Sequence, residues 1–322
     1  MSLSEFELIE RFFKRPARRA VLGIGDDAAL FVPTAGCEIA ISTDMLLEGR
    51  HFFSDAEPEA LGHKTLAVNL SDLAAMGARP RWALLACALP DADPSWLEAF
   101  ARGFFALADA HGVELIGGDT TRGPRNLCVT IIGEVPAGQA LLRSGAQPGE
   151  SIYVSGHLGD AALAVANRRG RIALAGDELT QCEAALARPT PRVALGQRLR
   201  GLATAAIDLS DGLTGDLGHI VAASEVGATV ELAAVPRSPA LDRRLAGPGR
   251  AVALECLLAG GDDYELCFTA ASAAAAKLHA LATETGIALT RIGTIEAAPT
   301  LAVVDERGLP LAAPRAFDHF LA

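Results

Sequence analysis

Apolar residues recur at helical spacing between residues 63 and 78, where the sequence reads HKTLAVNLSDLAAMGA. Leu66, Leu70 and Leu73 fall near one face of the helix that this spacing predicts. Asp72 lies inside the same apolar pattern. Because a buried carboxylate is costly unless a partner stabilises it, Asp72 is the first candidate for a functional residue.

Elsewhere the pattern alternates between strand-like and helix-like segments in both halves of the chain. Strands are expected within residues 21–32, 38–52, 82–88, 113–123, 127–135 and 151–155, at the start of 205–227, and within 228–233, 264–268, 287–295 and 300–304. Helices are expected near the N-terminus, at 94–111, after the glycine turn at 156–160, later in 205–227, and at 251–258 and 271–285. Polar residues 171–190 are expected to form a loop or hinge. This mixture predicts the α/β (α+β) class.

A chain of 322 residues is long for one hydrophobic core, so two domains are expected. Residues 138–149 contain three glycines and a proline and are expected to link a domain at 1–137 to one at 150–322.

Charge and cysteine content narrow the class of protein. The balance of 28 basic against 39 acidic residues gives −11, which argues against nucleic acid or an anionic membrane surface as a partner. No apolar run is long enough to span a membrane, and the N-terminus does not resemble a signal peptide. The six cysteines form no CxxC pair, as is typical of reduced thiols in a cytoplasmic protein.

The candidate chemistry lies in aspartates that occupy short Gly-, Ser- or Thr-rich breaks between apolar runs. These are Asp26, Asp27, Asp44, Asp119, Asp208, Asp211, Asp262 and Asp263. Carboxylates gathered in one cleft repel each other unless a cation lies between them. Mg²⁺ prefers such oxygen ligands together with substrate phosphate. The pattern therefore indicates divalent metal and, with it, a nucleotide.

Each of these aspartates, taken alone, is usually better explained as a helix cap or a turn residue, although for Asp26, Asp27 and Asp119 the two interpretations are even. Asp160 and Asp216 are assigned to the cap or turn role. Ser210 is expected to cap the helix that follows it, whatever else it does. His51, taken alone, is better explained as a surface or capping histidine than as a contact to an anionic substrate. Arg143 is as consistent with a solvated position as with a phosphate contact. The sequence contains no GxxxxGK[ST] loop and no kinase HRD motif. No serine, cysteine or histidine stands out with partners as a covalent nucleophile. Direct transfer of a group between two substrates is therefore the simpler mechanism.

Eight segments in order resemble one family. They are GIGDDAAL, ISTDMLLEGRHF, AVNLSDLAAMGA, IGGDTTRG, RSGAQPGE, AIDLSDGLTGDLGHI, GGDDYELCF and FDHF. Together they are similar to thiamine-monophosphate kinases, members of the aminoimidazole-ribonucleotide-synthetase-like ATP-binding superfamily. The resemblance implies an N-terminal domain that dimerises through its sheet and a C-terminal domain that covers the cleft. It also implies direct, in-line, Mg²⁺-assisted transfer of the ATP γ-phosphoryl group to thiamine monophosphate.

The resemblance further implies individual roles, with several Mg²⁺ ions as cofactors and ATP as co-substrate. The implied magnesium ligands are Asp27, Thr43, Asp44, Asp72, Asp119, Asp208 and Asp211, of which Asp72, Asp119 and Asp208 are the catalytic residues. The implied ATP contacts are Asp27, Ser42, Gly118, Asp119, Arg143 and Ser210. The implied contacts to the thiamine substrate are His51, Asp262 and Phe317. A homodimer in the cytoplasm is implied as well.

The sequence departs from the family pattern at two positions. Asp262 stands where glutamate is common, which puts its substrate contact in doubt, and Phe317 stands where Tyr or Trp is familiar. Within the superfamily, selenophosphate synthetase and the hydrogenase-maturation dehydratase carry reactive terminal-region cysteines that this chain lacks. A synthetase acting on a purine precursor is the next enzyme class to consider, and a non-catalytic nucleotide sensor comes after it.

Overall fold

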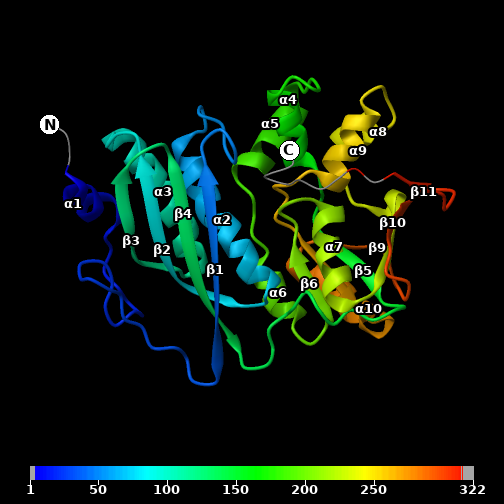
Figure 1. Ribbon diagram of the computed structural model, residues 1–322, viewed down its shortest axis with the longest axis horizontal. Helices are drawn as coiled ribbons and strands as arrows, with labels where there is room; N and C mark the ends of the chain where they lie inside the picture. Colours follow the sequence, from blue (N-terminus) through cyan, green and yellow to red (C-terminus); the bar gives the residue numbers. More distant parts are fainter. Residues whose placement is uncertain (1–3, 313, 315–322) are drawn as a thin grey trace. The chain divides into compact units, whose positions relative to one another are not determined.

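A computed structural model describes residues 4–312 and residue 314 of the chain. These residues form two compact units, each built around one β-sheet (Figure 1). The first unit comprises the chain up to Leu73 and residues 78–138, and the second comprises residues 74–77 and the chain from Gln139 onward. Strands and helices mix in both units, which confirms the predicted α/β class.

The first unit contains a four-stranded sheet with strand order β1-β4-β2-β3. Strand β4 pairs antiparallel with β1 and β2, whereas β2 and β3 run parallel. The strands are β1 Cys37–Leu47, β2 Arg79–Leu89, β3 Glu114–Arg122 and β4 Asn126–Pro136. The helices are α1 Glu5–Leu8, the π-helix η1 Ile9–Phe13, α2 Pro58–Ala75 and α3 Pro94–His111.

Helix α2 packs on one face of this sheet, and α3 packs on α2. Leu73 of α2 lies against Gly133 of β4, where an added Cβ would come within 2.9 Å of the leucine side chain. A Cβ at Gly62 would lie 2.0 Å from the Phe100 carbonyl oxygen, and one at Gly103 would lie 1.8 Å from that of Glu59. Only glycine allows the two helix backbones to approach this closely.

The ends of α3 coincide with the sequence prediction. The Asp93 carboxylate accepts a hydrogen bond from the Ser95 amide at 2.9 Å, and Pro94 occupies the first turn, where no amide donor is needed. Gly112 ends the helix in the left-handed conformation at φ 65°. Helix α2 was predicted from the apolar spacing within residues 63–78. It begins at Pro58, five residues before residue 63.

Residues 18–34, here called the strap, lie on the other face of the sheet. Phe31 stacks on Trp82 of β2 with 4.3 Å between ring centroids, and Ala20 and Ala29 pack on the same cluster. Leu22 and Leu30 pair through backbone hydrogen bonds of 3.0 and 2.9 Å. Only isolated bridges form in this segment, here and between Ile24 and Asp26, so the strand expected after the Gly-Asp turn is wrong.

The second unit contains a seven-stranded sheet with strand order β11-β10-β7-β9-β5-β8-β6. The strands are β5 Ser151–Ser155, β6 Ala205–Asp208, β7 Gly227–Glu231, β8 Leu266–Ala270, β9 Leu289–Glu296, β10 Leu301–Val304 and β11 Pro310–Leu311. The helices are α4 Asp160–Arg168, α5 Gly176–Ala187, α6 Val193–Leu199, α7 Leu213–Ser224, α8 Pro239–Leu245, α9 Arg250–Ala259 and α10 Ala275–Thr285, with 3-10 turns η2 Leu232–Ala234 and η3 Ser272–Ala274. Strand β8 is buried throughout, which corrects the one-faced alternation expected from Tyr264 to Phe268.

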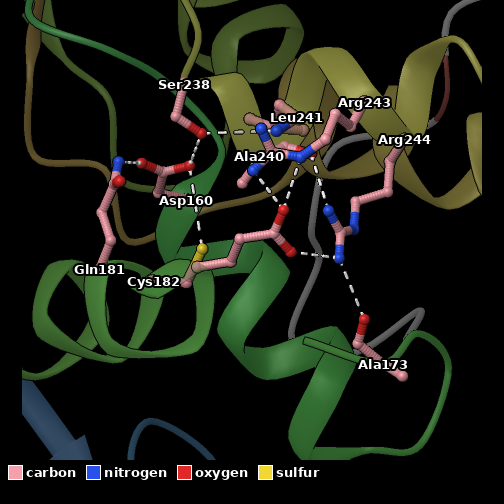
Figure 2. Close-up of polar contacts among 10 residues, drawn as sticks. Asp160, Ala173, Gln181, Cys182, Ser238, Ala240, Leu241, Arg243 and Arg244 are labelled. Carbon is pink, nitrogen blue, oxygen red and sulfur yellow. Dashed lines mark hydrogen bonds and ion pairs between the residues drawn. The ribbon is translucent and has the colours of Figure 1, made fainter. Parts of the chain in front are cut away.

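Helix α5 replaces the loop or hinge expected at residues 171–190. Its buried side chains are Cys182 and Leu186, so its apolar stripe is narrow and the sequence reads as polar. Glu178 forms ion pairs with Arg243 and Arg244 of α8, the second at 2.5 Å (Figure 2). Long-range ion pairs and a narrow stripe therefore hold a helix that periodicity did not reveal.

Asp160 connects the start of α4 to α5 and to the segment before α8 (Figure 2). Its carboxylate accepts a hydrogen bond from the Ser238 hydroxyl at 2.5 Å and one from the Gln181 amide at 2.8 Å. Burial, with the Asp160 charge adding to it, raises the pKa of the neighbouring Cys182 thiol to about 12. Asp160 therefore serves the packing of these helices, as the assignment to a structural role predicted.

Candidate active site

A hollow of about 1100 Å³ lies on the strap side of the first sheet. The strap contributes Asp26 and Asp27 to its lining, β3 contributes Gly118 and Asp119, and β4 contributes Thr130. Asp27 and Asp119 were both predicted to bind magnesium, and they are more than 90 residues apart in the sequence. The structure thus brings two predicted carboxylates to one concave surface.

Gly118 allows β3 to deliver Asp119 to this surface. Its φ is +146°, and an added Cβ would lie 1.9 Å from the Leu85 carbonyl oxygen of the neighbouring strand. Only glycine fits such an approach between backbones. Asp119 pairs with Ala86 in the parallel register, and its side chain is exposed toward the hollow.

Lys14 is a lining residue that the sequence analysis did not single out. Its ammonium pairs with Glu10 at 2.7 Å, and a Cβ added at Gly25 would lie 3.7 Å from the Lys14 Nζ. The available signal was rarity, since the chain has only three lysines. A cation at this position can neutralise part of the charge of an anionic ligand in the hollow.

Asp72 lies on the opposite, α2-covered face of the sheet. The Ser42 hydroxyl of β1 donates a hydrogen bond to Asp72 Oδ2 at 2.5 Å. The Asp44 amide donates to the Asn69 side-chain oxygen at 3.1 Å. The polar residues that interrupt the apolar pattern of α2 therefore meet the polar end of β1, which accounts for their position inside a buried helix.

Thr43 belongs to the strap side, since side chains alternate along a strand. Its hydroxyl is 2.8 Å from that of Thr130, which lines the hollow. The predicted ligands of the first unit thus fall on both faces of the sheet. Among residues 4–312 and 314, no group of three or more His, Cys, Asp or Glu side chains is arranged to hold a metal ion.

The hollow nevertheless has the donor set that magnesium uses. Mg²⁺ is commonly held by one or two carboxylates, with waters and substrate phosphate completing its coordination. Asp27 and Asp119 supply two carboxylates on one exposed surface. The residues present therefore fit a magnesium ion that arrives with a phosphate ligand.

His51 takes part in a turn after β1. Its Nδ1 accepts a hydrogen bond from the Leu47 amide at 3.0 Å, so the neutral ring carries its proton on Nε2. This contact is the capping role considered in the sequence analysis. Arg143 is exposed between β4 and β5, and Phe317 lies outside the described residues.

In the second unit, Asp208 ends β6 and is buried, and Ser210 and Asp211 follow it. The expected Ser210 cap is wrong, because the N-cap of α7 is Gly212. The Asp216 carboxylate instead accepts hydrogen bonds from the amides of Asp211 and Gly212, both at 3.0 Å. Burial raises the pKa of Asp216 to about 7 against the opposing effect of these bonds.

The loops that carry Ser210 and Asp262 are joined backbone to backbone. The Asp262 amide donates to the Ser210 carbonyl at 2.9 Å, and the Tyr264 amide donates to the Leu209 carbonyl at 2.8 Å. Asp262 and Tyr264 have backbone φ values of 70° and 49°, which residues other than glycine rarely adopt. The Tyr264 hydroxyl donates to Asp262 Oδ1 at 2.9 Å. The structure thus brings together two predicted site segments of this unit.

Asp263 has a different environment from its neighbour. Its Oδ1 accepts a hydrogen bond from the Gly159 amide at 2.8 Å. Its buried Oδ2 has no hydrogen-bond partner among the described residues. Burial raises the pKa of Asp263 well above its ordinary value, so a protonated carboxyl is favoured here. Asp263 therefore anchors the loop to the backbone at Gly159.

The domain families agree with this two-unit architecture. The N-terminal domain of AIR synthase related proteins matches residues 25–135, and the C-terminal domain of the same proteins matches residues 147–306. The chain is therefore an AIR synthase related protein with both domains.

Full-length relatives give the particular family. The thiamine-monophosphate kinase of Salmonella typhimurium (strain LT2) is 46% identical over 327 residues, which cover 99% of each chain. The crystal structure of the thiamine-monophosphate kinase of Stenotrophomonas maltophilia K279a is 51% identical, with a TM-score of 0.85 over 94% of this chain and 97% of that one. AaThiL complexed with AMPPCP and TMP is 29% identical, with a TM-score of 0.78 over 90% and 89%. This chain belongs to the thiamine-monophosphate kinase family.

Proposed function

We propose that this chain transfers the γ-phosphoryl group of ATP to thiamine monophosphate, giving thiamine diphosphate and ADP. The observation that carries the proposal is the meeting of Asp27 and Asp119 at one hollow, in a chain of the thiamine-monophosphate kinase family. AaThiL, a relative of the same fold, was crystallised with AMPPCP and TMP. A nucleotide and a thiamine phosphate are therefore the two substrates that suit this chain.

The hollow of the first unit is the proposed nucleotide site. Gly118 exposes backbone at its floor, and Asp27 and Asp119 face it. Ser42, which binds Asp72 on the α2-covered face, is assigned to the nucleotide outside the hollow. Arg143 and Ser210 of the second unit are assigned to it as well. Lys14 brings a positive charge to the lining of the hollow. This charge can attract a polyphosphate to a protein whose net charge is −11.

Magnesium ligands are proposed in both units. They are Asp27, Thr43, Asp44, Asp72 and Asp119 in the first unit and Asp208 and Asp211 in the second. Bound magnesium would neutralise phosphate charge and orient the transferring group. Ser42 holds the Asp72 carboxylate in a fixed orientation, and Asn69 does the same for the backbone at Asp44.

In this reaction the chain forms no covalent bond to the transferred phosphoryl group. A terminal oxygen of the acceptor phosphate forms a bond to the γ-phosphorus while the bond from that phosphorus to the bridging oxygen of ADP breaks, and ADP keeps the electron pair. Catalysis of such transfers is mostly positioning and charge stabilisation. Asp72, Asp119 and Asp208 are proposed as the catalytic residues in this sense.

The acceptor contacts are assigned to His51, Asp262 and Phe317. Tyr264 supports the assignment of Asp262, because its hydroxyl fixes Asp262 Oδ1 at the edge of the loop. A shorter side chain than glutamate thus retains a defined orientation. The Asp262 side chain reaches one methylene less far than glutamate, and its fixed orientation partly offsets this loss.

We propose a homodimer formed through the strap side of the first sheet. Strand β1 exposes large apolar side chains there, with Ile41 63%, Met45 48% and Leu47 38% exposed. Exposed apolar side chains in a row are typical of an interface. Light scattering of the wild type and of Ile41→Glu tests this, with a dimer expected for the first and a monomer for the second.

The chain is proposed to act in the cytoplasm. All six cysteines are free thiols, and four of them are buried. Such thiols persist in a reducing compartment. No helix among the described residues has the length and apolar character needed to cross a membrane.

Product formation tests the proposed function directly. The protein is incubated with ATP and Mg²⁺ and with thiamine monophosphate, free thiamine or an aminoimidazole ribonucleotide precursor as acceptor. We expect ADP and thiamine diphosphate only with thiamine monophosphate. ADP formation with another acceptor alone, or binding of nucleotide without turnover, would contradict the proposal.

A further inference from the structure

The strap holds Asp27 with few hydrogen bonds of its own. It forms no strand, and its internal pairing is limited to two isolated bridges, one between Leu22 and Leu30 and one between Ile24 and Asp26. Between Leu22 and Leu30, the Asp27 amide donates to the adjacent Asp26 carboxylate at 2.9 Å. Such a segment is mobile unless its ends are fixed. The position of Asp27 therefore depends on what holds the two ends of the strap.

Glu114, the first residue of β3, holds the beginning of the strap. Its carboxylate accepts hydrogen bonds from the backbone amides of Arg18, Arg19 and Ala20, at 3.2, 2.9 and 3.1 Å. The Arg19 guanidinium donates in turn to the Gly112 carbonyl at 2.5 Å. Three consecutive amides on one carboxylate define the direction in which the chain enters the strap.

Glu134 of β4 holds the other end and is only 4% exposed. Its two oxygens accept hydrogen bonds from the Thr34 amide at 2.6 Å and from the Thr34 hydroxyl at 2.8 Å. The Arg81 guanidinium pairs with the same carboxylate at 2.7 Å. Burial acts to raise the pKa of Glu134, but the Thr34 and Arg81 contacts outweigh it and hold the pKa below its ordinary value.

Both glutamates belong to the sheet that also carries Asp119. Glu114 begins the strand in which Asp119 lies, and it pairs with Trp82 of β2. Trp82 stacks on Phe31, three residues before Thr34. The strap is thus fixed to the sheet at three places: at its start by Glu114, at Phe31 by Trp82, and at Thr34 by Glu134. The separation of Asp27 and Asp119 follows from these attachments.

We propose that Glu114 and Glu134 are positioning residues that hold Asp27 opposite Asp119, and so set the affinity of the hollow for Mg²⁺ with a nucleotide. This inference rests on the proposed function, in which Asp27 and Asp119 are ligands. Neither glutamate lines the hollow. Outer partners of metal ligands commonly change metal affinity by about 10- to 100-fold.

The test compares Glu114→Gln and Glu134→Gln with Glu59→Gln. Glu59 of α2 pairs with Arg102 of α3 at 2.8 Å in the same unit. Its substitution therefore matches the loss of one charge in both strap variants, and the loss of an arginine ion pair in Glu134→Gln. Binding of ATP is titrated by calorimetry over a range of Mg²⁺ concentrations. Deuterium exchange of residues 18–34 is measured on the protein without metal. Neither measurement requires turnover of thiamine monophosphate.

For the two strap variants we expect about tenfold more Mg²⁺ at half-saturation and faster exchange within residues 18–34. The Glu59 variant should match the wild type in both. If a strap variant does not fold, Thr34→Ala removes one hydrogen bond to Glu134 and should shift both readouts in the same direction. Unchanged Mg²⁺ dependence, with or without a loss of melting temperature, would overturn the proposal. Normal binding without phosphorylation of thiamine monophosphate would instead overturn the proposed function.

Discussion

The Ser42 hydroxyl donates a hydrogen bond to the Asp72 carboxylate across 2.5 Å. Ser42 belongs to β1 and Asp72 to α2, so the bond joins the strand and the helix that carry two of the predicted site motifs. It supplies the partner that a carboxylate inside an apolar helix requires. Asp72 is therefore held in one orientation before any ligand arrives.

Asp72→Asn tests the role of this carboxylate. The amide keeps the size of the side chain and can still accept from Ser42, so the protein should remain folded, whereas the charge that a metal ligand provides is lost. We expect turnover to fall about 100-fold or more, a loss of the size caused by removing one group that stabilises charge in a transition state. Steady-state kinetics and circular dichroism measure the two effects.

Asp109→Asn is the matched control for this substitution. Asp109 lies on α3 of the same unit, is 70% exposed and pairs only with Arg15 among the contacts described here. Exposed ion pairs contribute little to stability. Normal turnover of Asp72→Asn, or equal loss in both variants, would argue against the assigned role.

Cys128 reports on occupancy of the hollow, because it lines the hollow and is half-buried. Burial, and then the negative charge of Asp44, raises the pKa of its thiol, so alkylation is measured at alkaline pH. We expect Mg²⁺ and a non-hydrolysable ATP analogue to slow alkylation of Cys128. Cys37, also half-buried but not a lining residue, is the internal control. Equal protection of both thiols would contradict a nucleotide site in the hollow.

Gly118→Ala tests the backbone approach beneath Asp119. The added methyl group would lie 1.9 Å from the Leu85 carbonyl at a φ of +146°. We expect a loss of unfolding free energy on the order of 3 kcal/mol or more, and loss of activity. Gly123→Ala is the control, since its nearest neighbour would lie at an ordinary 3.5 Å. Similar urea midpoints for the two variants would show that the strand can adjust.

Tyr264→Phe removes the hydroxyl that holds Asp262. We expect KM for thiamine monophosphate to rise about tenfold, with a smaller change in kcat, because a hydrogen bond to a charged group is lost while the ring remains. Tyr153→Phe is the control, because it is the other tyrosine of the chain and stacks on Phe268 at 5.4 Å in the sheet. An unchanged KM in Tyr264→Phe would separate Asp262 from the acceptor.

Glu178 gives the second unit a pH-dependent contact. A hydrogen bond from Arg244 holds the pKa of Glu178 below its ordinary value of 4.5, and Arg243 adds to this against the effect of burial. A carboxyl with a lowered folded-state pKa stabilises the fold above its unfolded-state pKa, and this contribution is lost as the pH falls through the folded-state value. Urea unfolding should show a steeper loss of stability below pH 4.5 in the wild type than in Glu178→Gln. Parallel curves would contradict this.

The sequence predicted the elements whose signals are local. Helix α3 has its cap, its proline and its terminal glycine within the sequence that it occupies. The Gly25-Asp26-Asp27 and Gly118-Asp119 sequences pointed to some of the residues that line the hollow, since a glycine beside a carboxylate is a signal readable without a structure. The family was identified from ordered motifs, and full-length relatives confirm it.

Contacts between residues distant in sequence could not be predicted. Glu114 and Glu134 resemble ordinary strand residues, and their donors in the strap lie 94 to 100 positions away, mostly in backbone amides that carry no sequence signal. Ser210 fits the sequence pattern of an N-cap, yet the N-cap of α7 is Gly212, two residues later. The left-handed φ of Tyr264 ended the alternation expected in β8.

The backbone bonds between Ser210 and Asp262 have a thermodynamic consequence. Because the two loops share these bonds, ordering either loop also restricts the other, so the entropic cost of fixing both is met by whichever ligand binds first. The second ligand then binds more tightly, and by linkage each substrate raises the affinity for the other by the same factor. With Ser210 assigned to the nucleotide and Asp262 to the acceptor, as proposed, these bonds predict synergistic binding of the two substrates.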